Sequence, residues 1–169
     1  EKSPSNALPL IRDWHDHGYD LRPQDTQYLG TLYGKACYCA PAPVNSASPE
    51  TMAFSELRPL YSLLEEDVFL LAGRALQIVT WHMTHQFCSK CGATVLKVEN
   101  EMAKRCAQCG FTSYPKISPA VITAIFKEDK ILLAHNHHFP ENLYSLVAGF
   151  VEPGETLEEC VIRETMEEV

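Results

Sequence analysis

The chain has 169 residues and a formal net charge of −8 at pH 7, and 46% of its residues are hydrophobic. This apolar content suffices for a real core in one domain or two small ones. No apolar run approaches the roughly 18 residues that cross a bilayer, and no basic stretch precedes a short apolar one as in a secretory signal. We therefore expect a cytoplasmic protein with no membrane partner. The acidic balance also argues against avid nonspecific binding of nucleic acid by the chain as a whole.

The first part of the chain is rich in proline and polar residues, with short apolar pieces at residues 28–33 and 36–40. This pattern predicts a small, partly irregular domain that contains β-structure, with a loop at residues 45–50. From residue 54 to residue 85 an apolar stripe predicts helix, in which Gly73 marks a break or a site of close packing. Trp14 and Trp81 are expected in the core. We take residues 1–85 as one small N-terminal α/β domain that ends in a helix.

The middle of the chain carries two pairs of cysteines, each with two residues between its members and a glycine directly after it: Cys88 and Cys91, then Cys106 and Cys109. Two such turns aim four thiolates at one ion and predict a zinc ribbon over residues 86–115. The Zn²⁺ should be structural, because four protein ligands leave no open position. Two disulfides or a redox-active pair are the alternatives. The odd total of seven cysteines and the lack of a signal peptide favour zinc.

Other cysteines and histidines in the chain receive structural interpretations. Cys37 and Cys39 are expected as buried or half-buried strand residues, and Cys160 as part of a helix core. His82 and His85 precede the ribbon at near-helical spacing, but the zinc already has four thiolates, so we interpret both as capping or packing residues. Three histidines near residue 136 are expected in a solvated loop, with contact to phosphate as the alternative: His135, His137 and His138.

The pattern of apolar and turn-forming residues in 116–169 predicts several strands followed by one helix. An apolar, β-branched run at residues 119–126 predicts a central strand, residues 128–130 a turn and residues 131–134 its hairpin partner. Residues 144–151 predict a third strand, which leads into the last segment of the chain.

That last segment has the pattern Gly-x5-Glu-x7-Arg-Glu-x2-Glu-Glu, formed by Gly149, Glu155, Arg163, Glu164, Glu167 and Glu168. Thr156 with Glu159 three residues later predicts a capping box, and apolar residues at helical spacing predict a helix from residue 157 to the end of the chain. The last three glutamates then fall within a sector of roughly 100°. Such a face attracts hard cations such as Mg²⁺ or Mn²⁺, which also bridge pyrophosphate oxygens. The alternative is an acidic helix end in solvent.

Arg163 precedes Glu167 by one helical turn and is predicted to hold that carboxylate in place. The whole spaced pattern, with its glycine and its capping box, resembles the Nudix box of hydrolases that cut a nucleoside diphosphate linked to another group. Thr165 stands where such boxes usually have an aliphatic residue, which should weaken the packing of the helix.

The ribbon, the Tyr114-Pro115-Lys116 segment and the box, in this order, resemble the NADH pyrophosphatase branch of the Nudix superfamily. The resemblance covers most of the chain beyond residue 70, whereas the first 55 residues match only by position. It implies an α+β fold: an N-terminal domain, the zinc ribbon, and a Nudix α/β/α sandwich with a mixed sheet, of which residues 116–169 are the first part.

The resemblance also implies roles for individual residues. Glu164, Glu167 and Glu168 resemble the catalytic, metal-binding glutamates, with one of them, or a water that they orient, as the base. The backbone carbonyl of Ala148 resembles a further metal contact. Phe150 resembles the ring that stacks on nicotinamide, with core packing as the alternative.

Two residues outside the box complete this set of substrate contacts. Glu101 and Tyr114 resemble nucleotide contacts of the ribbon and linker, with a solvated carboxylate and a buried tyrosine as the respective alternatives.

The implied activity is hydrolysis of NADH or NAD⁺ to nicotinamide mononucleotide and AMP, by a homodimer that uses Mg²⁺ or Mn²⁺. The same linkage occurs in NAD-capped RNA. A polyanion could use a basic edge of the ribbon formed by Lys90, Lys97, Lys104, Arg105 and Lys116. A zinc-ribbon module that binds nucleotide or protein without turnover is the alternative function.

The sequence ends at Val169, one residue before the glycine that closes a Nudix box. We therefore expect it to be part of a longer protein and not to complete the active site by itself. The family's later substrate-marker segment and a further metal-binding glutamate would lie beyond this point.

Overall fold

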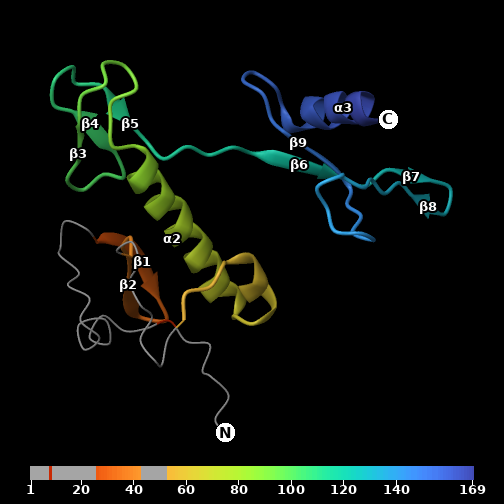
Figure 1. Ribbon diagram of the computed structural model, residues 1–169, viewed down its shortest axis with the longest axis horizontal. Helices are drawn as coiled ribbons and strands as arrows, with labels where there is room; N and C mark the ends of the chain where they lie inside the picture. The colour runs from red at the N-terminus through yellow and green to blue at the C-terminus, as the bar shows by residue number, and fades with distance from the viewer. Residues whose placement is uncertain (1–7, 9–25, 43–52) are drawn as a thin grey trace, which may run out of the picture. The chain divides into compact units, whose positions relative to one another are not determined.

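The computed structural model describes residues 8, 26–42 and 53–169 (Figure 1). The predictions for Trp14 and for the loop at residues 45–50 lie outside these residues. The chain separates into two compact units, Glu1–Pro115 and Lys116–Val169, and each unit contains both helix and strand. The α+β class is confirmed. Among the described residues, no helix is both long enough and apolar enough to cross a membrane.

The first unit contains an antiparallel hairpin of β1 (Gln27–Leu32) and β2 (Lys35–Cys39), which matches the two apolar pieces of the sequence. Its two turn residues, Tyr33 and Gly34, both have positive φ, the geometry of the tight turns that follow strand twist. The hydroxyl of Tyr33 donates to Oδ2 of Asp67 at 3.0 Å, so the turn is tied to the start of the following helix.

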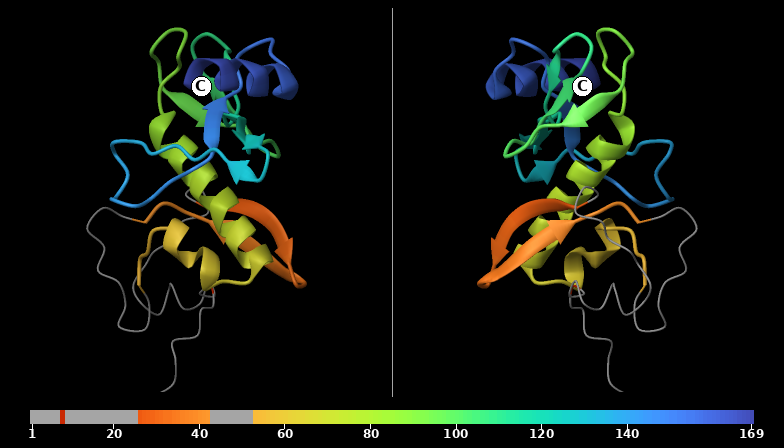
Figure 2. Two further views of the ribbon diagram at one scale, coloured as in Figure 1. Left: turned by 90° about the vertical axis from the view of Figure 1, so that its right-hand side faces the viewer. Right: turned by 90° about the vertical axis from the view of Figure 1, so that its left-hand side faces the viewer.

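That helix, α2 (Glu66–Thr84), packs on β1 and β2 and follows a short 3-10 helix, η2 (Arg58–Ser62) (Figure 2). Gly73 lies inside α2 and does not break it, so the break considered from the sequence is wrong. A Cβ at this position would lie 3.7 Å from the side chain of Leu57, which is ordinary packing contact. Ile78 and Trp81 are the buried residues of α2, which confirms Trp81 as core.

The zinc-ribbon segment forms a three-stranded antiparallel sheet in the order β3-β4-β5 (Val95–Lys97, Lys104–Cys106, Thr112–Ser113). The first cysteine pair lies at the turn before β3, and the second consists of Cys106, the last residue of β4, and Cys109 in the turn that follows. Gly92 and Gly110 have φ of 77° and 70°, a conformation that residues with a Cβ rarely adopt. The glycine after each pair therefore closes the turn, as its position in the sequence predicts.

The second unit contains two antiparallel strand pairs, β6 (Ala120–Thr123) with β9 (Val147–Phe150), and β7 (Phe126–Lys127) with β8 (Lys130–Ile131). The predicted strand at 119–126 is thus two short strands, and the predicted turn joins β7 to β8. All strand pairs among the described residues are antiparallel, so the parallel pairing that a mixed sheet requires is not among them.

Helix α3 (Leu157–Glu168) packs on β6 and β9. The capping box is confirmed: Oγ1 of Thr156 accepts from the Glu159 N–H at 3.2 Å, and the Glu159 carboxylate accepts from the Thr156 N–H at 2.8 Å. Cys160 is fully buried between helix and sheet, as predicted. The cap fixes where α3 begins, and Cys160 fixes which face it buries.

Replacing Thr156 by alanine should lower the free energy of unfolding of this unit by about 1 kcal/mol, because the backbone N–H of Glu159 loses its side-chain acceptor. Chemical unfolding followed by circular dichroism measures the change. Thr156→Ser keeps the hydroxyl and should retain most of the stability. Equal stability of the alanine variant and the parent would show that the cap does not hold α3.

Candidate functional site

The guanidinium of Arg163 organises the carboxylates around α3. It forms a two-pronged ion pair with Glu155, Nε to Oε1 at 2.8 Å and Nη2 to Oε2 at 3.0 Å. Nη1 donates to Glu164 at 2.8 Å and to Glu167 at 3.3 Å. The sequence predicted the contact with Glu167, but the shorter contacts are those with Glu155 and Glu164.

Glu155 lies in the loop before α3, and its partner could not be predicted from the sequence. The hydrogen bonds from Arg163, followed by one from the backbone N–H of Glu152, lower the pKa of the Glu155 carboxyl to about 2. The same pairing, with Glu155 first and Glu164 second, raises the pKa of Arg163. Glu155 and Arg163 are eight residues apart in the sequence, and this spacing was the one hint of a pair. Because the eight residues span both a loop and a helix, the spacing does not fix the distance between the two side chains, and only the tertiary structure reveals the pair.

Gly149 makes room for Glu164. A Cβ built on Gly149 would overlap the carboxylate of Glu164, so any side chain here would push that carboxylate away from β9. The φ of Gly149 is not positive, and the requirement is therefore for space. As a result the Glu164 side chain is only 13% exposed, against 59% for Glu167.

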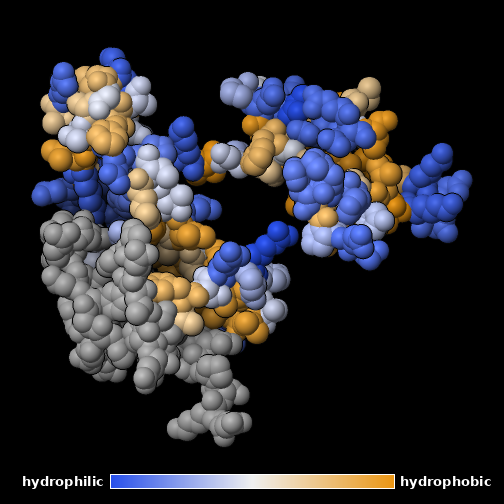
Figure 3. All heavy atoms as spheres, in the orientation of Figure 1, coloured by the Kyte–Doolittle hydropathy of each residue, from blue (hydrophilic) through white to orange (hydrophobic). Residues whose placement is uncertain are grey.

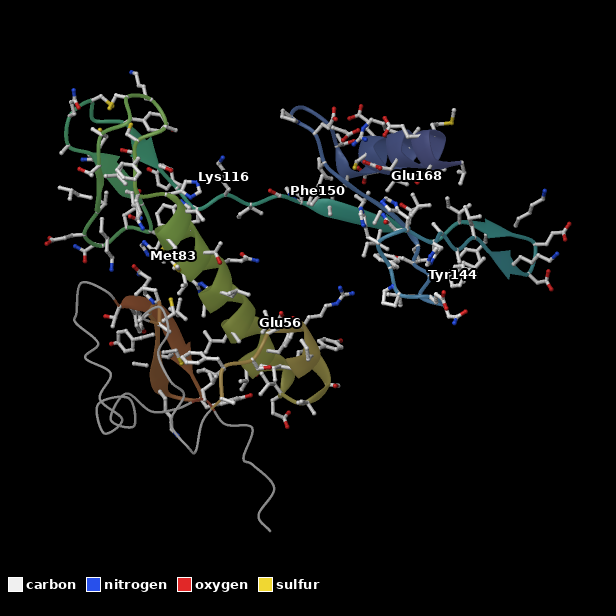
Figure 4. The ribbon with its side chains drawn as sticks, viewed as in Figure 1. Glu56, Met83, Lys116, Tyr144, Phe150 and Glu168 are labelled. Carbon is white, nitrogen blue, oxygen red and sulfur yellow. The ribbon has the colours of Figure 1, made fainter. Side chains whose placement is uncertain are left out.

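The three predicted metal-binding glutamates share α3 but differ in surroundings. Arg163 contacts one oxygen each of Glu164 and Glu167. Glu168 is exposed near the end of the helix (Figure 4). Hydrophilic side chains gather over α3 in the face shown in Figure 3. The structure thus brings Glu164 and Glu167 to one cation, but it does not gather all three carboxylates at metal-ligand distances among the described residues.

Ala148 and Phe150 flank Gly149 on β9, and Ala148 pairs with Ile122 of β6. Phe150 is 66% exposed within the part of the chain that the structure describes, so the described residues do not bury it. Its backbone carbonyl accepts from Nη2 of Arg163 at 2.9 Å and from the Cys160 thiol at 3.5 Å. The residue that presents this ring is therefore anchored to the same guanidinium as the carboxylates.

Glu101 and Tyr114 lie in the first unit and contact one another. The Tyr114 hydroxyl donates to Oε1 of Glu101 at 3.1 Å, and this hydrogen bond, followed by the negative charge of Glu101, raises the pKa of Tyr114. Tyr114 is 55% exposed within the described part of the first unit. The contact between Glu101 and Tyr114 could not be predicted from the sequence, because β4 and β5 lie between them along the chain.

The four ribbon cysteines form one cluster, with their sulfur atoms within 4.8 Å of one another. The sulfur of Cys88 lies 3.6 Å from that of Cys109, and Cys91 lies 3.5 Å from Cys106. A tetrahedral zinc with Zn–S bonds of about 2.3 Å places its ligands about 3.8 Å apart. All four are free cysteines, so the disulfide alternative is wrong, and the cluster supports a structural zinc.

Backbone groups around this cluster favour thiolates, the form that binds zinc. The N–H of Lys90 points to the Cys88 sulfur at 3.4 Å, and the N–H of Cys109 to the Cys106 sulfur at 3.5 Å. The N–H of Cys109 is the largest cause that lowers the pKa of the Cys106 thiol to about 6.

His82, one of the described histidines, is a packing residue, as predicted. The His82 ring packs on Trp81 with centroids 4.9 Å apart, and burial, followed by the charges of Lys104 and Lys97, lowers its pKa to about 4. Among the described residues, the cysteine cluster is the one group with three or more potential ligand atoms close enough for a metal. The histidines at positions 135, 137 and 138 are exposed, as expected for a solvated loop.

The prediction that Lys104 belongs to an exposed basic edge of the ribbon is wrong. Lys104 is only 8% exposed, and its ammonium donates to the backbone carbonyls of His82 and His85 at 2.9 and 2.8 Å. Lys104 is therefore not part of the surface that a polyanion would meet. Lys90, Lys97, Arg105 and Lys116 remain exposed.

Three family models match consecutive parts of the chain. A NADH pyrophosphatase-like rudimentary NUDIX domain matches residues 1–81, a NADH pyrophosphatase zinc ribbon domain residues 84–114, and a NUDIX domain residues 116–169. The chain belongs to the Nudix superfamily. The order of the three domains places it in the NADH pyrophosphatase branch that carries a zinc ribbon, which confirms the resemblance noted in the sequence.

The relatives carry the name NAD-capped RNA hydrolase NudC. The chain is 38% identical over 167 residues to the one from Pseudomonas syringae pv. syringae, and 43% identical over 169 residues to the one from Pseudomonas fluorescens Pf0-1. These matches cover 98% and 97% of this chain and 59% of each relative. A third, from Photobacterium profundum, is 45% identical over 105 residues, 62% of this chain and 40% of the relative. The chain thus spans about three fifths of the first two relatives' length.

The pairing of Glu155 with Arg163 generates a prediction for acid stability. The folded-state pKa of Glu155 is about 2 against an ordinary 4.5, so the pair stabilises the fold fully above pH 4.5 and loses this contribution as the pH falls toward 2. Glu155→Gln should be less stable than the parent at pH 7 and should lose less additional stability between pH 4.5 and 2.

Unfolding by urea at a series of pH values measures this difference. Glu158→Gln, a matched change at an exposed carboxylate in the first turn of α3, should follow the parent curve. Parallel pH curves for Glu155→Gln and the parent would contradict the pairing.

Proposed function

We propose that this chain forms part of a hydrolase that cleaves the pyrophosphate bond of NADH or NAD⁺ and releases nicotinamide mononucleotide and AMP. The observation that carries the proposal is the carboxylate group around Arg163, packed against Gly149, in a chain that also holds a four-cysteine ribbon. We divide the chain at residues 85 and 115 into an N-terminal domain, the ribbon and the first part of the Nudix domain.

The proposed metal-binding residues are Glu164, Glu167 and Glu168, with the carbonyl of Ala148. Their oxygen donors fit a hard cation, and Arg163 engages only one oxygen each of Glu164 and Glu167, which leaves the other oxygen for a metal. Bound Mg²⁺ or Mn²⁺ would neutralise phosphate charge and lower the pKa of the attacking water. One of the glutamates, directly or through a water that it orients, accepts the proton of that water.

The proposed substrate contacts are aromatic and polar. The exposed Phe150 ring offers a face for stacking on a flat base, and Arg163 holds its backbone in place. Glu101 and Tyr114 form a hydrogen-bonded pair that offers polar groups to a nucleotide. Phe150 acts by stacking, whereas Glu101 and Tyr114 act by hydrogen bonding.

NAD-capped RNA is a second proposed substrate, because the relatives carry that name and the cap contains the same pyrophosphate bond. The exposed Lys90 and Arg105 offer positive charge to an RNA chain. We further propose a homodimer, from family resemblance, and a cytoplasmic location, because free cysteines suit a reducing compartment. A zinc-ribbon module that binds without turnover is the competing function, but it gives no reason for the acidic face of α3.

Hydrolysis of NADH by the full-length protein with Mn²⁺ tests the enzyme proposal. Nicotinamide mononucleotide and AMP should appear, and Glu168→Gln should lower kcat on the order of a hundredfold, since a carboxylate proposed to bind the metal or accept the proton is lost. Chromatography of the products measures both. Glu158→Gln, on the same helix, should keep parent activity. A folded, zinc-loaded protein that releases neither product would favour the binding module.

Release of NAD caps from RNA tests the second substrate. Arg105→Ala should weaken binding of capped RNA and reduce the slope of log affinity against log salt by about 0.7, because one phosphate contact is lost. Hydrolysis of free NADH should not change, which separates RNA binding from catalysis. Unaltered RNA affinity at every salt concentration would remove Arg105 from the RNA surface.

A further inference from the structure

Two lysines face each other on the ribbon hairpin. Lys97 of β3 and Lys104 of β4 are direct partners in the antiparallel register. Like charges in such a pair destabilise a hairpin unless each finds a partner of opposite sign. Both lysines find backbone carbonyl oxygens, and these belong to elements outside the ribbon.

Lys104 reaches the end of α2. Its ammonium donates to the carbonyls of His82 and His85 and lies 5.3 Å from the centre of the buried Trp81 ring. The last carbonyls of a helix lack partners within the helix and carry the negative end of its dipole. A buried ammonium at this position therefore acts as a C-terminal cap for α2.

Lys97 reaches the strand hairpin of the N-terminal part. Its ammonium donates to the carbonyl of Thr26 at 3.1 Å, directly before β1 begins. One ribbon hairpin thus contacts both the end of α2 and the start of β1. Both contacts lie within the first unit of the chain.

A cavity of about 260 Å³ lies among these groups, lined by both lysines, His82, Cys39 and apolar residues of α2 and β3. Among the described residues, no carboxylate lines it, and carbonyl oxygens already neutralise part of the charge of the two ammonium groups. The negative helix end would also repel an anion. The two lysines are therefore better explained as groups that hold the ribbon to α2 and to the start of β1 than as a site for a ligand.

The zinc cluster is joined to Lys104 through one strand. Lys104 and Cys106 lie on the same buried face of β4, with the exposed Arg105 between them on the opposite face. A metal that fixes Cys106 therefore also fixes the direction in which Lys104 points.

We propose that the ribbon is a zinc-dependent clasp, in which the zinc ligand Cys106 keeps Lys104 on the last turn of α2 and Lys97 on the start of β1. Loss of zinc releases β4, removes the cap from α2 and loosens the N-terminal part. This inference requires the zinc site but does not depend on the proposed hydrolase activity.

Hydrogen exchange of the full-length protein, measured by mass spectrometry with zinc and after chelation, tests the clasp. In the parent protein, chelation should accelerate exchange of amides at residues 80–85 on the order of tenfold, because a charged hydrogen-bonding partner is lost. Lys104→Met should show the same acceleration with zinc still bound, as metal analysis verifies. Further chelation should then add little in this segment.

Arg105→Met is the matched control, since it removes the same charge from the exposed face of the same strand. Its α2 amides should exchange as in the parent. The clasp is wrong if chelation leaves residues 80–85 unchanged in the parent, or if zinc-loaded Lys104→Met exchanges there like the parent. Should Lys104→Met fail to fold, the parent with and without chelator decides the question.

Discussion

The second unit depends on one cation, the guanidinium of Arg163, which donates to three carboxylates and one backbone carbonyl. Arg163 pairs with Glu155, contacts Glu164 and Glu167, and holds the carbonyl of Phe150. Several carboxylates close together repel one another, so an acidic face on α3 requires a nearby positive charge. Because Arg163 supplies that charge from within the helix, the loop before α3, the helix itself and the end of β9 keep a fixed relation. The site proposed for metal and substrate is built on this arrangement.

Gly149 and Cys160 show how the backbone accommodates that arrangement. The missing side chain at Gly149 lets the Glu164 carboxylate lie against β9. The buried thiol of Cys160 fills the space between helix and strand and donates to the Phe150 carbonyl. The apolar contact sets the distance between α3 and the sheet, and the charged contacts set the direction of each side chain.

In the first unit the like charges that lie close together are positive. The ribbon brings two lysines together, and backbone carbonyls at the end of α2 and before β1 neutralise them. The four thiolates are supported in turn by backbone N–H groups. In both units, backbone N–H and carbonyl groups therefore stabilise charged side chains that other side chains do not neutralise completely.

The sequence by itself determined features that depend on near neighbours: the capping box of α3, the glycine-closed cysteine turns, the apolar segments that become β1 and β2, and the shared face of the three glutamates. These follow from spacing, because helix and strand periods are fixed by backbone geometry. It did not reveal the Glu155–Arg163 pair, the Tyr114–Glu101 contact or the burial of Lys104, which it had placed on a basic surface. Only the tertiary structure decided these, since each joins residues from different elements whose distance depends on how the chain packs.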